Sequence, residues 1–561
     1  MKKWTINFAL FISMTFLLSL GSSAQTITEL AQPLTKQSQK GYIDDVKFEG
    51  DGKIHVIYQN KLDKKSTEVA YEDYVFDKGM KFVEKKTTTI DKEIKPDSES
   101  KMLGAYVGGG PKCTSFDVLS MKIRTVTFTR KYSDWNYKKQ RYETIKDVDQ
   151  ERGKLKTDDN KPYYGIESWW REDNPLLTVL AYNETKDKKN PKKYLLLNID
   201  FDGNVKETPL DVSGSYSLVY SQKISEEQPG KAVGKQDVVV ILAPKDGAPN
   251  LSEYIYLHYD MSGTLKNKIT FQSPSTNLLV TNATVIDGAV FLFGQSTKSK
   301  KAFNDVFEDY AAIESPCFKG SGGDAENPQM SKYLKASSEE MDNFHVFKIT
   351  GGKLDFATTS SVDGIKSKVK SPPSEKGTPY KGKRFSIYKF EVTPSNEYLI
   401  AGQLTDRITT KAATSSQVGM RGWSYGDIVC LHLDAKGNLK AQYAVDKIWE
   451  GKKSSLWEMP QNFYFAADGK SVYWEIFEIK GDRDYNAWTG WSDYVQSQMY
   501  PRITKINLET TTISDFKTFG NRKYFVYQSF PSKFLPEQNC ILYFGKNEDE
   551  SVLWVGKAAF D

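Results

Sequence analysis

Short runs of alternating apolar and polar residues recur along the chain, and turn-forming residues separate them. The clearest set lies between Phe385 and Tyr443, where the pattern predicts strands at 387–392, 398–402, 427–433 and 439–443. Alternation with a period of two, joined by turns rich in Gly, Asn and Asp, is the signal of antiparallel hairpins. This stretch therefore predicts one four-stranded antiparallel sheet.

Parts of this set recur elsewhere in the chain. A third strand, a tight turn and a fourth strand follow one another around five turn glycines: Gly79, Gly203, Gly263, Gly352 and Gly437. The second strand recurs as Phe-Leu-Phe-Gly294-Gln295, Leu-Ile-Ala-Gly402-Gln403 and Leu-Tyr-Phe-Gly545-Lys546. A sheet of this size cannot bury both of its faces alone, so we expect the copies to stack on one another.

The copies add up to eight units, at 42–90, 113–157, 160–210, 214–271, 278–358, 385–445, 460–520 and 524–561. Gly203 and Gly263 are 60 residues apart, whereas Gly79 and Gly203 are 124 apart, so one degenerate unit fits between the latter two. Seven units is the alternative, because the unit at 113–157 depends mainly on this spacing.

The two ends of the chain complement each other. The last unit supplies three strands, and the segment from Thr26 to Thr35 precedes the first complete unit without partners of its own. If this segment pairs with the last strand, the array closes into a ring and two exposed sheet edges disappear.

This organisation resembles that of β-propeller proteins, in which each unit is a blade. The turn from Asp434 to Asn438, which follows the run Ile-Val-Cys-Leu-His-Leu, is similar to turns in bacterial propeller repeats. The resemblance implies an all-β fold with a single propeller, and it is generic. The WD, kelch and sialidase-type signatures and the tryptophan-docking motif of quinoproteins are missing.

The first residues are typical of a signal peptide. An apolar run from Phe8 to Leu20 follows two lysines and leads to Ser-Ser-Ala24, the kind of small residues after which a signal peptidase cuts. A membrane anchor is the competing interpretation, but a membrane-spanning helix needs about 20 apolar residues and this run is shorter. Gln25 rather than Cys follows the cut, which disfavours a lipoprotein. We expect cleavage of 1–24, a propeller domain at 25–561 and no membrane span afterwards.

Composition and charge narrow the possible partners. With 13% aromatic and 39% hydrophobic residues, the chain has the composition of a β-rich globular protein. Loss of the lysines at 2 and 3 lowers the formal charge from +5 to +3, which gives no electrostatic case for nucleic acid. Cys430 and Cys540 lie in predicted strands and are expected in the core, whereas Cys113 and Cys317 lie in predicted loops, where a disulfide is an open alternative.

The long insertions are sorted by position. Those at 298–342, 405–426 and 481–500 join second to third strands, and those at 90–112 and 359–384 join one blade to the next. In a propeller all these connections emerge on the same face, and the exception is a long loop expected on the other face, Gln222 to Gln236. Loops on a rigid scaffold are where binding and catalysis usually occur, so we place the function on this face.

Aromatic residues single out one sector of that face. Five tryptophans, three tyrosines and three aspartates in loops between 405 and 500 are the candidate binding residues: Trp423, Tyr425, Trp449, Trp457, Tyr485, Trp488, Trp491, Tyr494, Asp482, Asp484 and Asp493. Exposed aromatic rings suit both protein partners and sugar faces. The alternative is that these rings form the small core that long loops need.

Motifs of catalysis and metal binding were sought and not found. The sequence contains no Cys-x-x-Cys, His-Glu-x-x-His or Gly-x-Ser-x-Gly motif, and we expect neither a metal nor a cofactor. His258 and His432 each precede a turn glycine by five residues, so they are equivalent positions and are expected to be structural. Carboxylate pairs drawn from different blades stay open, because they are distant in sequence, and the catalytic residues are unknown.

Two hypotheses follow. The first is an exported, non-catalytic propeller that binds a protein or glycan at the outer membrane or in the periplasm, as a subunit of a cell-envelope complex. The second is a carbohydrate-active hydrolase or lyase that uses Asp or Glu at the mouth of the central channel.

Overall fold

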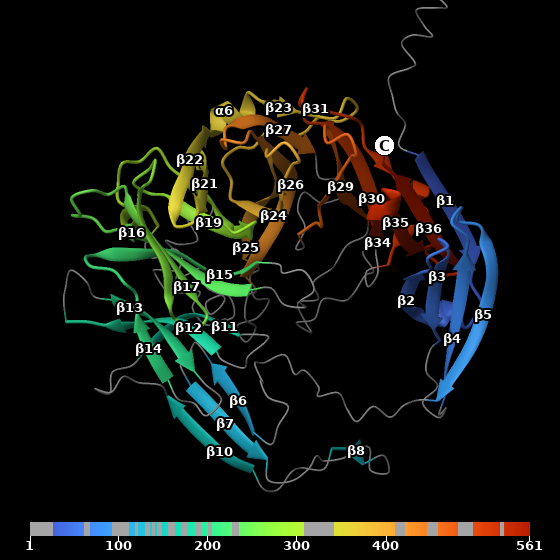
Figure 1. Cartoon of the computed structure of the whole chain (residues 1–561), viewed down its shortest axis with the longest axis horizontal. Coiled ribbons are helices and arrows are strands. Elements are labelled where there is room, and N and C mark those ends of the chain that lie inside the picture. Colours follow the sequence, from blue (N-terminus) through green and yellow to red (C-terminus); the bar gives the residue numbers. More distant parts are fainter. Residues whose placement is uncertain are drawn as a thin grey trace, which may run out of the picture.

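The computed structural model of the chain describes residues 26–60, 68–91, 112–117, 122–128, 135–136, 141–142, 148–154, 163–170, 177–186, 192–199, 205–226, 235–307, 341–409, 421–445, 458–480, 498–527 and 532–560. Within these residues the strands form eight sheets, antiparallel except where β23 joins β27, and one small ribbon, β8–β9 (Trp135–Asn136 and Arg141–Tyr142). The sheets follow one another around a common axis in chain order, with the first strand of each inside and the last outside (Figure 1). The fold is an all-β propeller of eight blades.

The first four blades match the units expected from the sequence. Blade 1 contains β2 (Tyr42–Phe48), β3 (Ile54–Gln59), β4 (Glu68–Phe76) and β5 (Phe82–Asp91). Blade 2 contains β6 (Lys112–Asp117), β7 (Lys122–Phe128) and β10 (Val148–Lys154). Blade 3 contains β11 (Tyr164–Trp170), β12 (Leu177–Glu184), β13 (Lys192–Ile199) and β14 (Val205–Pro209). Blade 4 contains β15 (Tyr216–Glu226), β16 (Lys235–Pro244), β17 (Glu253–Asp260) and β18 (Leu265–Gln272).

The other four blades also match. Blade 5 contains β19 (Leu279–Ile286), β20 (Ala289–Ser296), β21 (Asn343–Thr350) and β22 (Lys353–Ser361). Blade 6 contains β24 (Phe385–Val392), β25 (Tyr398–Thr409), β26 (Arg421–Leu433) and β27 (Leu439–Val445). Blade 7 contains β28 (Asn462–Phe465), β29 (Ser471–Lys480), β30 (Gln498–Asn507), β31 (Thr512–Ile513) and β32 (Lys517–Thr518). Blade 8 contains β33 (Phe525–Val526), β34 (Ser532–Leu535), β35 (Cys540–Lys546) and β36 (Val552–Ala559).

The ring closes as the sequence predicts. Strand β1 (Thr26–Pro33) pairs antiparallel with β36, from Thr26 opposite Ala559 to Pro33 opposite Val552. The carboxylate of Glu29 ties this strand to two neighbours, because the indole of Trp554 donates to it at 3.1 Å and the backbone N–H of Gly520 at 3.2 Å. Residues 26–33 therefore complete the last blade.

The chain that follows β1 is fastened to blade 1 by a buried carboxylate. Glu72 accepts hydrogen bonds from the Ser38 hydroxyl at 2.5 Å, from Lys85 Nζ at 2.7 Å and from the Thr35 hydroxyl. Burial alone would raise the pKa of Glu72, but these donors outweigh it and the pKa is lowered. The closing segment thus bridges blade 8 and blade 1.

The core lies between the blades. Side chains of two neighbouring blades form one apolar cluster at each junction from blade 3 round to blade 1, such as Leu180 and Leu196 with Val240, or Leu542 and Phe544 with Val56. Both faces of a second strand are covered in this way, so every residue of β20 is buried. This explains why the second strands appear in the sequence as continuous apolar runs rather than as alternating patterns.

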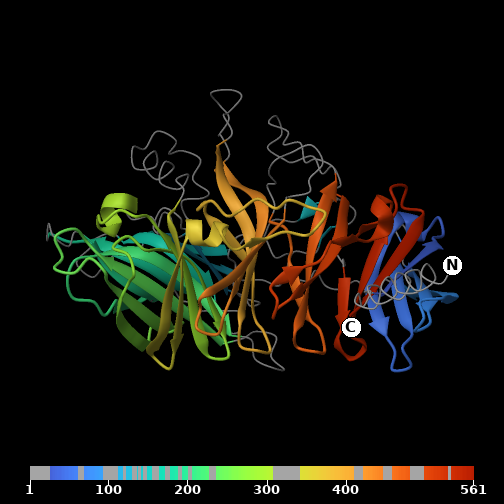
Figure 2. The same cartoon turned by 90° about the horizontal axis from the view of Figure 1, so that it is seen from above.

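One face carries the insertions, and we call it the insertion face. It carries helix α2 (Phe303–Phe307), helix α6 (Val362–Lys366) and the ends of β25 and β26, while hairpin turns occupy the other face (Figure 2). Two connections differ from the loops expected. The segment 359–384 contains α6 and β23 (Val369–Lys370), which pairs in parallel with β27, and half of 405–426 is strand.

Three short 3-10 helices complete the described elements: η1 (Ser38–Lys40), η2 (Gly520–Arg522) and η3 (Pro536–Gln538). Cys430 and Cys540 are buried free thiols in β26 and β35, as expected. Cys113 lies in strand β6 and not in a loop, and Cys317 lies outside the described residues, so a disulfide between them stays an open alternative. No described helix has the length and apolar character that a membrane crossing requires.

Candidate functional site

A two-stranded arm rises from blade 6 on the insertion face. Residues 405–409 of β25 continue past the sheet and pair with 421–425 of β26, from Thr405 opposite Tyr425 to Thr409 opposite Arg421. Trp423 lies opposite Arg407 in this register. Trp423 and Tyr425, expected in a loop, therefore belong to a strand.

The other candidate residues are not placed by the structure. Nine of them lie outside the described residues: Trp449, Trp457, Tyr485, Trp488, Trp491, Tyr494, Asp482, Asp484 and Asp493. Their role in binding stays a prediction.

At the base of the arm the chain brings together residues that are distant in sequence. The carbonyl of Arg384 accepts a hydrogen bond from the backbone N–H of Thr405 at 2.8 Å, and Thr405 lies opposite Tyr425. The side chain of Gln403 accepts from the backbone N–H of Met459 at 2.6 Å, which holds Glu458 beside the same end of β25. Three separate segments therefore meet around residues 403–405.

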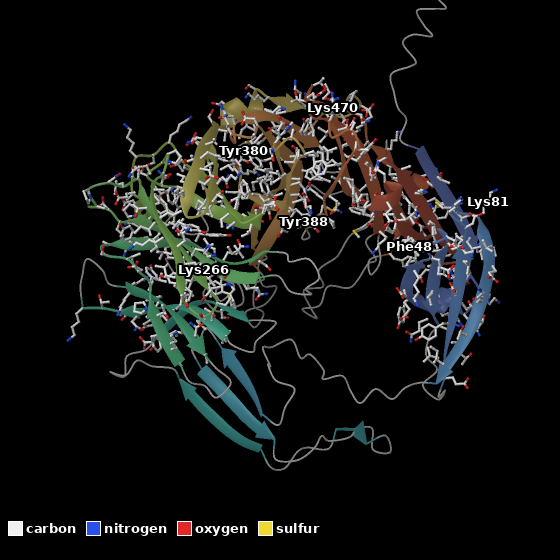
Figure 3. All side chains as sticks on the ribbon, in the orientation of Figure 1. Phe48, Lys81, Lys266, Tyr380, Tyr388 and Lys470 are labelled. Atoms are coloured by element: carbon white, nitrogen blue, oxygen red, sulfur yellow. The ribbon has the colours of Figure 1, made fainter. Side chains whose placement is uncertain are left out.

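A backbone irregularity places Tyr388 near this point. The pairing of β24 with β25 shifts between Ile387, opposite Gly402, and Lys389, opposite Ala401, so Tyr388 is an extra residue in β24. Such bulges redirect side chains. Tyr388 is 41% exposed and lies at the inner rim of the ring (Figure 3).

The ionisable side chains around this point shift one another's pKa values. Burial raises the pKa of Glu458, and a hydrogen bond from Ser386 only partly offsets this. Burial, followed by the Glu458 carboxylate, raises the pKa of both Tyr388 and Tyr425, while Arg384 opposes the increase at Tyr425. We refer to Arg384, Tyr388, Tyr425 and Glu458 as the inner-rim group.

The chemistry available to the inner-rim group follows from these shifts. Glu458 takes up a proton more readily than an exposed glutamate, and its Oε1 is buried without a hydrogen-bond partner among the described residues. Tyr388 keeps its proton and is a hydrogen-bond donor at neutral pH. The group can therefore accept hydrogen bonds from hydroxyls, donate them, and offer one ring face.

A second carboxylate, that of Glu475 in β29, lies deeper between blades 7 and 8. It accepts hydrogen bonds from Asn462 Nδ2 at 2.7 Å, from the Tyr464 hydroxyl at 3.1 Å and from the Tyr543 hydroxyl at 2.5 Å. Burial raises its pKa, although these donors oppose the increase. Since the carboxylate is fully buried, its role is to join blades, while its charge still contributes to the raised pKa of Tyr388.

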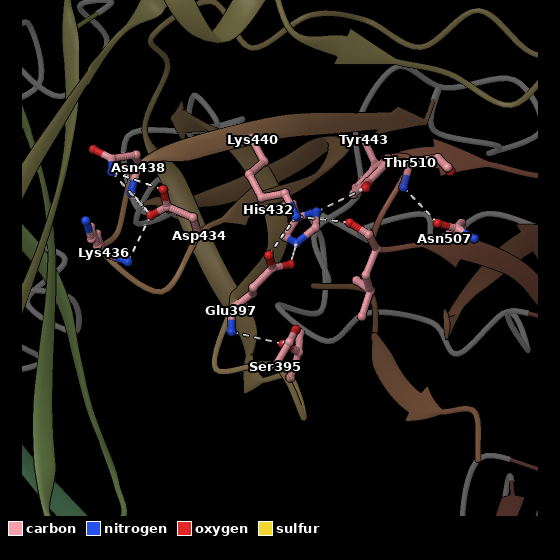
Figure 4. Close-up of polar contacts among 12 residues, drawn as sticks. Ser395, Glu397, His432, Asp434, Lys436, Asn438, Lys440, Tyr443, Asn507 and Thr510 are labelled. Atoms are coloured by element: carbon pink, nitrogen blue, oxygen red, sulfur yellow. Dashed lines mark hydrogen bonds and ion pairs between the residues drawn. The ribbon is translucent and has the colours of Figure 1, made fainter. Parts of the chain in front are cut away.

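The histidines are structural, as expected from their equivalent positions. His432 Nε2 lies 2.7 Å from Glu397 Oε2, and Lys440 Nζ lies 2.7 Å from Glu397 Oε1 (Figure 4). In blade 4, His258, Asp237 and Lys266 repeat this set at matching strand positions, with His258 Nε2 2.9 Å from Asp237 Oδ2. Both sets lie towards the hairpin-turn face, away from the arm.

Sequence reasoning missed three members of the inner-rim group, namely Arg384, Tyr388 and Glu458. One available signal was the repeated Gly-Gln pair of the second strand. Gln295 donates to the carbonyl of Lys383 at 2.9 Å, and Gln403 accepts from Met459, so each glutamine holds the connection that enters the next blade. The residues beside those connections, Arg384 and Glu458, are thereby fixed at the rim.

The comparisons with known proteins do not assign a family. A scan against protein families finds no match, and a search of curated protein sequences finds none. Among solved structures, the chain is similar to a member of the DUF4221 family from Bacteroides vulgatus, with 12% identity over 71% of this chain and 94% of that one, at a TM-score of 0.23.

Two further structures are of enzymes. The GH93 alpha-L-arabinofuranosidase of Fusarium graminearum is 10% identical over 70% of this chain and 92% of that one, with a TM-score of 0.25. Puromycin hydrolase is 8% identical over 91% of this chain and 59% of its own, with a TM-score of 0.26. Similarity at this level identifies no repeat family and no activity, and the propeller rests on the strand pairing itself.

Proposed function

We propose that the protein is an exported, non-catalytic propeller that binds a protein or glycan through its insertion face, as part of an assembly of the cell envelope. The arm is the observation that supports this proposal best. Residues 405–409 and 421–425 continue the ladder of β25 and β26 beyond the blade, with Trp423 and Tyr425 on one strand. A paired ribbon on a rigid blade presents its side chains with little loss of entropy on binding.

Export belongs to the proposal. Cleavage after Ala24 would leave Gln25 as the first residue, one position before β1, so the closing strand would survive processing intact. We place the mature protein in the periplasm, at the outer membrane or outside the cell. Fractionation of cells that produce the full chain, with N-terminal sequencing of the product, tests this placement, and an uncleaved product would contradict it.

Capture experiments test the binding function. The mature chain is immobilised and exposed to envelope proteins and envelope polysaccharides, beside a variant in which 406–424 is replaced by Asn-Gly. This turn suits the junction because Thr405 and Tyr425 are ladder partners. We expect the mature chain to retain a partner that the variant loses. Capture by neither chain would contradict the binding function, whereas equal capture by both would exclude the arm as the binding surface.

One observation favours the second candidate, a carbohydrate-active hydrolase or lyase. The raised pKa of Glu458 beside Tyr388 is a property that a general acid needs. Turnover of a polysaccharide by the mature chain, lost in a Glu458→Gln variant, would establish this function instead of the first.

A further inference from the structure

The inner-rim group contains a buried acceptor whose hydrogen bonding is incomplete. The Glu475 carboxylate has three donors, and Glu397 bonds to both His432 and Lys440. By contrast, Oε1 of Glu458 is buried without a partner among the described residues. Leaving a buried acceptor unpaired is costly, so such an atom marks a place where an external donor would be stabilised.

Tyr388 adds an apolar surface beside this acceptor. First strands line the axis, and the described tyrosine Tyr220 in β15 is hydrogen-bonded to Gln222 of its own strand. Tyr388 is the extra residue of a bulge that also occurs in the first strands of blades 1, 3, 4 and 5, and 41% of its surface is exposed. A large amphipathic ring that is partly exposed offers contact area at a low entropic cost.

The charges identify the kind of ligand. Glu458 raises the pKa of Tyr425 and Arg384 lowers it, so a carboxylate and a cation both lie near Tyr425. An anionic ligand would approach Glu458 and a cationic one would approach Arg384, and each would meet a like charge. A neutral polyol meets neither penalty, because its hydroxyls donate to Glu458 and accept from Arg384.

We propose that Arg384, Tyr388, Tyr425 and Glu458 form a binding site for a neutral sugar residue of a glycan, on the axial side of blade 6. The sugar's apolar face packs on the ring of Tyr388, and its hydroxyls complete the bonding of Glu458. This inference rests on the proposed function, since it selects the glycan over the protein as ligand and names the residues that hold it.

The test is a titration of the mature chain with neutral oligosaccharides, namely gluco-, manno-, xylo- and arabino-oligosaccharides, and with an oligouronate as the acidic counterpart. Tyr388→Ala and Glu458→Gln are compared with Tyr164→Ala, which removes another tyrosine of a first strand that is 36% exposed. Tyr388→Phe keeps the ring, and thermal unfolding verifies that each variant is folded.

We expect one neutral oligosaccharide to bind, with Tyr388→Ala and Glu458→Gln each weakening the Kd by about tenfold or more and Tyr164→Ala leaving it unchanged. Turnover of that oligosaccharide would still support the site and would overturn only the non-catalytic function. Unchanged binding by the two variants, or preference for the oligouronate, overturns the site and leaves the proposed function standing. Capture of a protein partner with no binding of any sugar also overturns the site alone. Capture of neither a protein nor a polysaccharide overturns the site and the proposed function together.

Discussion

The carboxylate of Glu475 stabilises the junction of blades 7 and 8 only as long as its donors are in place. Asn462 and Tyr464 approach it from its own blade and Tyr543 from the next. Replacement by Ala would leave three buried donors without an acceptor. We predict that Glu475→Ala lowers the free energy of unfolding by about 3 kcal/mol, measured by urea denaturation at pH 7.

Glu475→Gln is the matched comparison. Because burial raises the pKa of Glu475 in the folded protein, its contribution to stability is full below the unfolded pKa and is lost as the pH rises through the folded pKa. The glutamine variant cannot titrate. We expect its stability to fall less than that of the wild type as the pH rises from 4.5, and an equal decline in both proteins would contradict this account.

His345 titrates in the opposite sense. Burial lowers its pKa from 6.5 to about 4, and its two ring nitrogens lie 2.8 Å from Ser296 Oγ and 2.9 Å from Thr359 Oγ1. The unfolded chain therefore binds a proton below pH 6.5 that the folded protein binds only near pH 4. Stability is full above this window and is lost as the pH falls through it, by about 3 kcal/mol.

We predict that His345→Gln reduces this acid-dependent loss, because the amide can hydrogen-bond to Ser296 and Thr359 without titrating. The free energy of unfolding, followed between pH 7 and pH 4, measures the difference. Parallel curves for the two proteins would show that His345 does not contribute in this way.

For single residues, the sequence predicted where a side chain lies better than what the side chain does. Equivalent spacing before a turn glycine correctly indicated structural roles for His258 and His432. Glu458 could not be found in this way, because its burial is created by contacts with Ser386 and the end of β25, which are far from it in sequence.

Among the elements, the glycine of the second strand has a physical explanation. A Cβ at Gly402 would lie 1.9 Å from the carbonyl oxygen of Ser386, and one at Gly545 would lie 2.3 Å from that of Phe525. The first strand therefore approaches too closely for any side chain. This close approach explains why a glycine recurs at this position of the second strand, as Gly294, Gly402 and Gly545.

We predict that Gly402→Ala lowers the free energy of unfolding by about 3 kcal/mol, since backbone must move to admit the methyl group. Gly50→Ala is the control, because a Cβ there meets nothing within 4 Å. The control is expected to change stability by less than about 0.5 kcal/mol. Thermal or urea unfolding of both variants measures this, and similar values for the two would refute the explanation.

Strand ends were harder to predict than strands. Residues 398–402 were expected to form a strand, and β25 continues to Thr409. The arm continues past the blade, and its two sequences, Thr-Asp-Arg-Ile-Thr and Arg-Gly-Trp-Ser-Tyr, lack the alternation of apolar and polar residues that indicates a strand. The connection 359–384 was expected to be a loop because β23 is only two residues long and is a strand only through its pairing with the edge strand β27.

For the whole molecule, the sequence predicted the blade number, the blade boundaries and the closure. These follow from repetition, because eight copies of one sheet and one unpaired first segment leave few other arrangements. The sequence could not predict the paths of the connections between blades. The segment after blade 5 hydrogen-bonds to blade 7, where the backbone N–H of Ser374 donates to Asp515 at 2.6 Å, and no local pattern encodes that contact.

The orientation of the blades and of the insertion face depends on closure of the ring. Thr28 of β1 lies opposite Lys557 of β36. Cysteines at directly opposed positions of antiparallel strands are close enough for a disulfide, whereas a partner displaced by two residues is about 7–8 Å away. The pair Thr28→Cys with Lys557→Cys is therefore compared with Thr26→Cys with Lys557→Cys, in which the partner is displaced by two residues.

Mass spectrometry of peptides from the oxidised protein, residues 25–561, is the most direct measurement. We predict a disulfide between positions 28 and 557, formed within one chain, and little or none between positions 26 and 557. Failure of the first pair to cross-link, or equal cross-linking of both pairs, would contradict the closure of the ring.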